Sequence, residues 1–222
     1  MLKSRAIISA SLVVLMALFV IPGAASGATT LTEAGKAVAS GETVNLTTTS
    51  LFFTSASGSM TCTTASLKGI VHQNEKGLIK ITIISGSVGG TGTKGANEEP
   101  RCTSTLPFNP QFEVAVQNLH YCIENEPSTD KFLITAKTCT EDKAPRNLKF
   151  TLTSALTGGC TYEAAQFTGE FTTNVTPAAL SVEKQGFTRT AGGVGCPEVG
   201  ELKASWSLET GTSPFTGLTI SP

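Results

Sequence analysis

Six cysteines, all placed after an apolar N-terminal leader, restrict what this chain can fold into more than any other feature of its sequence. They are Cys62, Cys102, Cys122, Cys139, Cys160 and Cys196. An even number of cysteines in a chain that leaves the cytoplasm is typical of disulfide bonds. The spacings contain no C-x-x-C pair, so they favour neither a zinc ribbon nor a thioredoxin-type redox site. We therefore expect a fold braced by three disulfides.

The leader, residues 1–28, has the pattern of a secretory signal peptide. Lys3 and Arg5 give a positive start, residues 6–21 are uncharged and apolar, and small residues follow up to Ala28. This order predicts cleavage after Ala28 and secretion to the extracellular space or the cell surface. The alternative is an uncleaved membrane anchor, but small residues rather than a charged stop follow the apolar run.

The charge of the predicted mature chain is close to neutral. The leader carries two basic residues and no acid, so the formal net charge of −1 becomes −3 without it. A charge this small gives no long-range attraction to nucleic acid or to anionic lipid. No second long apolar run follows the leader, so we expect no membrane association after cleavage.

Alternation of apolar and polar residues runs through most of the mature chain and predicts β-strands. In residues 76–87, for example, Ile79, Ile81 and Ile83 fall on one face. Clusters of Gly, Pro, Asn and Ser separate the alternating segments and predict turns. The other alternating segments are residues 110–122, 130–138, 147–154, 166–173, 179–184 and 200–210.

The expected fold class is all-β, a β-sandwich of the immunoglobulin-like or a related type. Many short strands with turn signals about every 8–12 residues are typical of that architecture. The only helix signal lies in residues 30–42 of the leader segment 29–44, where Gly35 and Gly41 interrupt it. That segment fits one or two helical turns, or a frayed strand.

A short internal recurrence suggests two related units. Residues 54–62 read TSASGSMTC and residues 153–160 read TSALTGGC, and a glycine follows each cysteine at Gly69 and Gly169. We interpret this as a first β unit at 45–155 and a second at 156–222. The alternatives are chance similarity in a chain rich in Thr and Ser, and one larger sandwich in place of two small ones.

The recurrence also predicts how the cysteines pair. Equivalent units would each close their own bridge, Cys62–Cys102 in the first and Cys160–Cys196 in the second. Cys122 and Cys139 are then left to pair with each other. Six cysteines allow 15 connectivities, so this prediction depends on the repeat alone.

The stretches FFTSASGSMTCTTASLKG (residues 52–69) and CTYEAAQFTGEFTT (residues 160–173) resemble a group of uncharacterised secreted β proteins of high-GC Gram-positive bacteria. The resemblance covers most of the mature chain and consists of the spacing of Thr, Gly and Cys. It implies a secreted β fold, and it implies no catalytic residue, cofactor or partner.

Candidate chemistry is sparse. The two histidines, His72 and His120, lie in strand-like segments, where a structural or surface role is favoured, and no G-x-S-x-G nucleophile motif occurs. Two acidic loops offer oxygen ligands for calcium, or an acid and base for glycoside hydrolysis. Solvated turn acids are the favoured interpretation for this set, which is Glu98, Glu99, Glu124, Glu126 and Asp130.

Whether Trp206 is buried or exposed distinguishes an interaction or structural role from polysaccharide binding. It shares its face with Ala204 and Leu208, which predicts a core position rather than an exposed platform for sugars. The sequence thus favours a secreted, non-enzymatic β protein with a structural or interaction role and no cofactor. Its expected partner is a cell-surface protein or a polysaccharide. A polysaccharide-binding module is the alternative, and a hydrolase would need Glu98, Glu126 and His120 to converge in a cleft.

Overall fold

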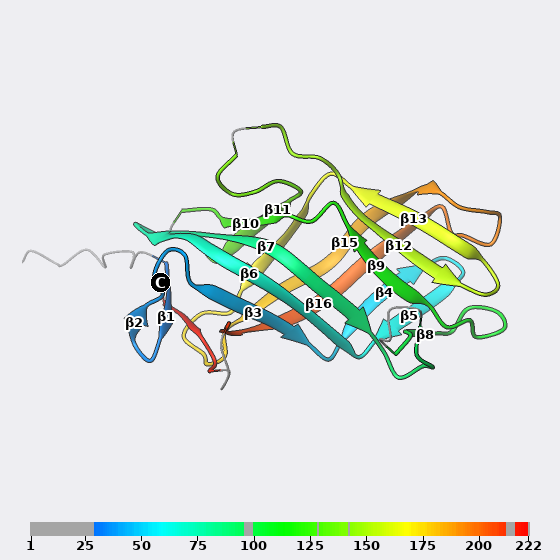
Figure 1. Ribbon diagram of the computed structural model, residues 1–222, viewed down its shortest axis with the longest axis horizontal. Helices are drawn as coiled ribbons and strands as arrows, with labels where there is room; N and C mark the ends of the chain where they lie inside the picture. Colours follow the sequence, from blue (N-terminus) through cyan, green and yellow to red (C-terminus); the bar gives the residue numbers. More distant parts are fainter. Residues whose placement is uncertain (1–28, 96–99, 128, 142, 212–215, 222) are drawn as a thin grey trace, which may run out of the picture.

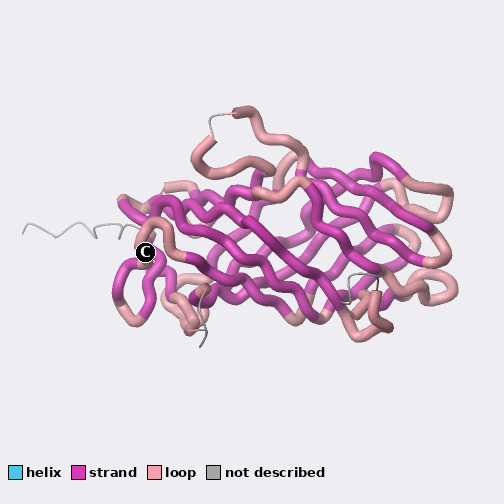
Figure 2. Tube along the Cα trace, in the orientation of Figure 1, coloured by secondary structure: helices cyan, strands magenta, loops and turns pink. Residues whose placement is uncertain are grey.

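The computed structural model describes residues 29–95, 100–127, 129–141, 143–211 and 216–221. These residues form β-strands joined by turns and loops and contain no helix (Figure 2). The all-β prediction is therefore confirmed. The predicted signal peptide, residues 1–28, lies outside the described residues. Within the described ranges no helix is long and apolar enough to cross a membrane.

Eight antiparallel strands close into a barrel. Each strand pairs with the next around the ring, and β16 closes it by pairing with both β15 and β3. In ring order the strands are β3 (Thr43–Thr48), β6 (Thr64–Glu75), β7 (Leu78–Gly89), β10 (Tyr121–Asn125), β11 (Lys131–Thr135), β14 (Phe167–Phe171), β15 (Ala179–Ala191) and β16 (Val199–Thr210).

The predicted immunoglobulin-like sandwich is wrong, because the sheet closes on itself. Alternation specifies that each strand buries one face, and two facing sheets or one curled sheet satisfy that demand equally well. The pairing of β15 with β16 closes the sheet into a barrel. This contact extends from Ala179 opposite Ser207 to Thr188 opposite Val199, and it leaves the ring without an edge.

The long β15–β16 hairpin continues beyond the barrel and carries a second group of strands (Figure 1). A bulge between Val182 and Gln185, where Lys184 has a φ of 47°, marks the change of direction. β13 (Gly158–Ala164), β12 (Leu148–Ser154) and β9 (Glu113–Gln117) follow β15 outward. β4 (Leu51–Ser55), β5 (Gly58–Cys62) and β8 (Thr103–Ser104) follow β16.

The outer edges of this second group also meet. The backbone groups of Cys102, just before β8, and Phe112, just before β9, exchange hydrogen bonds of 2.8 and 2.9 Å. The second group is therefore tied into a ring as well, and it shares β15 and β16 with the barrel.

The core follows the alternation seen in the sequence. Ile79, Ile81 and Ile83 of β7 are buried, and β16 buries every second residue through Leu208. Trp206 is only 6% exposed, so its predicted core position is confirmed.

The segment 29–44, which follows the predicted signal peptide, forms strands and no helix. β1 (Thr30–Glu33) pairs with β2 (Lys36–Ala37) and with β17 (Thr219–Ser221). These three strands lie at the barrel end of the molecule (Figure 1). The Asn74 side chain fixes this small sheet, because its amide donates to the carbonyl oxygens of Leu31 and Val38 at 2.6 and 2.9 Å.

Both copies of the Thr-Ser-Ala recurrence lead into a hairpin turn, in β4–β5 and in β12–β13. The two hairpins join the sheet through different strands. The first strand of one hairpin, β4, lies next to β16, whereas the second strand of the other, β13, lies next to β15. Strands of the two predicted units pair with each other across the sheet, as β16 does with β3 and β4. The division at residues 155 and 156 stays a prediction.

Candidate functional site

The six cysteines form the three predicted disulfides, Cys62–Cys102, Cys122–Cys139 and Cys160–Cys196. No cysteine is free among the described residues. The predicted pairing is thus confirmed, and three disulfides indicate an oxidising, extracellular type of environment.

Four connections meet at the end of the molecule opposite β1 and β17 (Figure 1). We call this surface the loop end and define it as residues 56–57, 105–112, 155–157 and 192–198. Its segments are the turns of the β4–β5, β12–β13 and β15–β16 hairpins and the connection between β8 and β9. The loop end has few charges, because Glu198 is the single charged residue within these segments.

Large apolar side chains project from three of the four segments. Phe108 is 91% exposed, Leu156 is 62% exposed, and Val194 is fully exposed. Val199, at the start of β16 beside these turns, is also exposed. The remaining exposed large apolar residue of the described chain is Val175, which lies near β17 at the opposite end. Four of the five exposed large apolar residues of the described chain thus lie at this end, which marks it as a candidate interaction surface.

Two of the three disulfides hold the loop end in place. Cys62–Cys102 ties β5 to the start of β8, and Cys160–Cys196 ties β13 to the β15–β16 turn. Each closes a loop of about 40 residues, for which the stabilisation is about 2–4 kcal/mol. Only glycine fits at position 192, where φ is +127° and a Cβ would lie 2.6 Å from the Cys196 Sγ.

Hydrogen bonds link the segments further. Thr105 and Ser59 exchange backbone and side-chain bonds, including 2.8 Å from the Thr105 N–H to the Ser59 carbonyl. The Arg189 guanidinium donates to the Gly193 carbonyl at 3.0 Å and lies 3.8 Å from the Glu198 carboxylate. The one charge of the loop end therefore has an opposite charge beside it.

An aromatic cluster supports the loop end from below. The rings of Phe53, Phe150, Tyr162 and Phe187 contact one another with centroids 5.0 to 6.0 Å apart. Such pairs add stabilisation beyond the burial of their area. The exposed side chains of the loop end thus lie above a packed aromatic core.

The acidic residues considered as candidate calcium ligands are described only in part. Glu124 on β10 pairs with Lys80 on β7 at 3.0 Å. Glu126 and Asp130 lie in the β10–β11 connection, while Glu98 and Glu99 are outside the described residues. Among the described residues no three His, Cys, Asp or Glu side chains are grouped as metal ligands would be.

The two described residues of the hydrolase hypothesis, His120 and Glu126, are separated. His120 directly precedes β10 and Glu126 directly follows it. A five-residue strand spans about 17 Å, which is too far for an acid and a base to share one bond. His72 lies within β6, and its carbonyl accepts a hydrogen bond from Ser40 at 2.9 Å.

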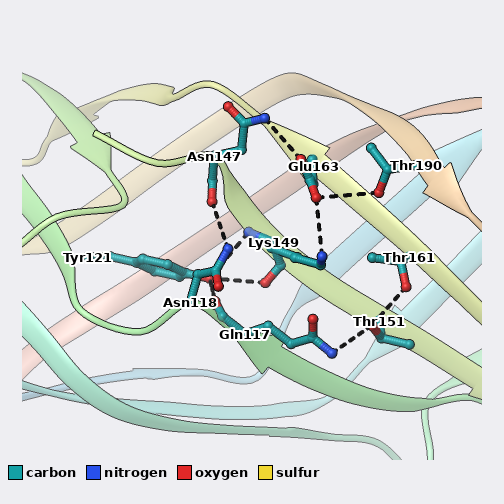
Figure 3. Close-up of polar contacts among 9 residues, drawn as sticks. All are labelled: Gln117, Asn118, Tyr121, Asn147, Lys149, Thr151, Thr161, Glu163 and Thr190. Carbon is teal, nitrogen blue, oxygen red and sulfur yellow. Dashed lines mark hydrogen bonds and ion pairs between the residues drawn. The ribbon is translucent and has the colours of Figure 1, made fainter. Parts of the chain in front are cut away.

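A polar network covers the outer face of β12 and β13 (Figure 3). The Glu163 carboxylate accepts hydrogen bonds from Asn147 at 2.9 Å and from Thr190 at 3.5 Å, and pairs with Lys149 at 3.3 Å. These contacts, the Asn147 bond first, lower the pKa of Glu163. The network joins neighbouring strands and stabilises the charged carboxylate.

Comparison with protein-family models, with curated proteins and with solved structures finds no match. Sequence reasoning missed the loop end, since it treated these segments as turns. A signal was present, because Phe108 and Val194 stand in TLPFNP and AGGVG, where Gly and Pro leave an apolar side chain no strand in which to be buried.

Proposed function

We propose that this chain is a secreted, non-enzymatic protein that acts by binding a protein at the cell surface through its loop end. The observation that carries the proposal is the gathering of Phe108, Leu156 and Val194 on disulfide-braced loops. Binding residues are commonly placed on loops that a rigid scaffold positions.

The composition of the loop end favours a protein over a polysaccharide. Centres of protein interfaces are depleted in charge and enriched in large apolar and aromatic residues. A sugar platform needs flat exposed aromatic rings, and Trp206 is buried instead. Phe108 is the one aromatic residue exposed among the described large apolar side chains.

A photo-crosslinking residue placed at position 194 tests the contact. The protein is expressed in the cells that produce it naturally, and the intact cells are irradiated. We expect a covalent adduct with a surface protein from position 194 and none from the matched position 175 at the other end. Equal adducts from both positions, or none from either, would contradict the proposal.

A variant set tests which side chains supply the affinity. The triple change Phe108→Ser, Leu156→Ser and Val194→Ser is expected to abolish the adduct, with the crosslinker moved to position 199. Val175→Ser is the control and should leave the adduct unchanged. All of these positions are exposed, so the melting temperature of each variant should stay close to that of the parent.

Secretion is tested separately. N-terminal sequencing of the protein recovered from the culture medium or the cell surface should begin at Thr29. A chain that retains Lys3 and Arg5 would contradict cleavage.

A further inference from the structure

An apolar cavity of about 100 Å³ lies within the fold, between the barrel and the second group of strands. Barrel residues such as Leu46, Ile83 and Trp206 form part of its wall, and Phe53 and Phe150 of the second group form the rest. All five of these side chains are buried.

The side chains of the wall are almost all apolar, and the one buried polar atom among them without a hydrogen-bond partner in the described structure is Trp206 Nε1, a donor. Tyr121 and Lys149 are the other wall residues with polar side chains, and the polar ends of both are engaged elsewhere. The Tyr121 hydroxyl donates to the Lys149 carbonyl at 3.0 Å, and the Lys149 ammonium pairs with Glu163. The wall therefore holds a molecule mainly by apolar contacts and offers it no free hydrogen-bond acceptor.

We propose that this cavity is a binding site for one small apolar molecule, of about the size of benzene and without hydrogen-bond donors. Closed eight-stranded barrels are wide enough to hold one small ligand. An apolar cavity of about 150 Å³, somewhat larger than this one, stays dry and takes up benzene or xenon, because water there would lack partners. This proposal is independent of the loop end.

Access runs along the line where β7 and β9 lie side by side. In the described structure β7 and β9 are neighbours, but no backbone hydrogen bonds pair them with each other. The wall residues that keep partial exposure surround this line, because Tyr121 is opposite Ile83 and Leu67 is opposite Gly86 of β7. The other two, Val116 and Lys149, lie on β9 and β12 beside it.

Trp206 reports occupancy directly, since it is the only tryptophan of the chain and forms part of the wall. Bromobenzene added to the mature protein should quench its fluorescence in a saturable way. Iodide ion should not, because the side chain is buried. Absence of saturable quenching by bromobenzene would overturn the proposal.

Two matched substitutions locate the site. Ala65→Leu fills part of the cavity and should abolish the quenching, whereas Ala164→Leu, packed against the core but outside the cavity wall, should keep it. Equal quenching in both variants would contradict the proposal. If Ala65→Leu does not fold, Val116→Phe at the partly exposed edge of the cavity takes its place.

Ligand chemistry supplies a further test on the unmodified protein. Benzene should raise the melting temperature, since it binds the folded state alone. Phenol should bind at least about fivefold more weakly, because its O–H would be buried without an acceptor: the one unpartnered polar atom of the wall side chains, Trp206 Nε1, is itself a donor. Phenol binding as tightly as benzene would contradict an apolar site.

Discussion

The Tyr121 hydroxyl, at the start of β10, donates a hydrogen bond of 3.0 Å to the carbonyl oxygen of Lys149 on β12. It also contacts the carbonyl oxygen of Gln117 at the end of β9. Tyr121 belongs to the barrel, and both acceptors belong to the second group of strands. One phenol group thus bridges the two parts of the fold beside the unpaired line between β7 and β9.

Tyr121→Phe should lower the free energy of unfolding by about 1 kcal/mol, because it removes the hydroxyl and keeps the ring. Urea denaturation measures the change. Stability equal to that of the parent would show that the bridge is not formed in solution.

Both tyrosines of the chain should titrate above the ordinary value of 10.0, because burial raises the pKa of Tyr121 and of Tyr162. A raised pKa means that the folded state keeps its proton longer than the unfolded state. The resulting stability is fully present below pH 10.0 and is lost as the pH rises through the folded values. Tyrosinate absorbance, followed against pH with and without denaturant, measures the difference; two coincident curves would contradict it.

The pKa of Glu163 should lie below 4.5 in the folded protein, with the Asn147 hydrogen bond as the largest cause. The stability that this carboxylate contributes is present above the unfolded pKa and is lost as the pH falls through the folded value. Asn147→Ala should raise the pKa of Glu163, as followed by NMR titration. Thr190→Ala, which removes the longest contact, should raise it less; the reverse order would contradict the assignment.

Gly69 and Gly169 are the glycines that follow the first cysteine of each recurrence. Substitution by alanine should destabilise the fold to different extents at these two positions. A Cβ at Gly169 would meet the Ser181 carbonyl oxygen at 2.1 Å and the Phe132 ring at 2.3 Å. At Gly69 it would meet the side chain of Ile81 at 2.6 Å.

We therefore expect Gly169→Ala to cost about 3 kcal/mol and Gly69→Ala about 1 kcal/mol, because a side chain moves aside more easily than backbone. Gly186→Ala is the control, since a Cβ there meets nothing within 4 Å. Thermal and urea unfolding of the three variants measure the order, and a Gly186→Ala variant as unstable as Gly169→Ala would contradict it.

The strands and the disulfides could be predicted from the sequence, whereas the closure of the sheet could not. Alternation along β7 and β16 fixes which side chains are buried, and Trp206 follows from its neighbours two residues away on each side. Closure depends on β15 pairing with β16 from Ala179 to Thr188, and the alternating pattern ended that strand at Lys184, where the bulge lies. The position of Phe108, Leu156 and Val194 at one end of the molecule depends on the pairing of strands that are distant in the sequence, which local patterns do not encode.

Two disulfides brace the loop end on a closed barrel, and we propose that the protein lies outside the cytoplasm. Peptide mapping of the unreduced protein, recovered from the medium or cell surface, tests both statements most directly. The account predicts three linked pairs, Cys62–Cys102, Cys122–Cys139 and Cys160–Cys196, and no reactive thiol after unfolding. Any free thiol, or Cys62 linked to a residue other than Cys102, would contradict it.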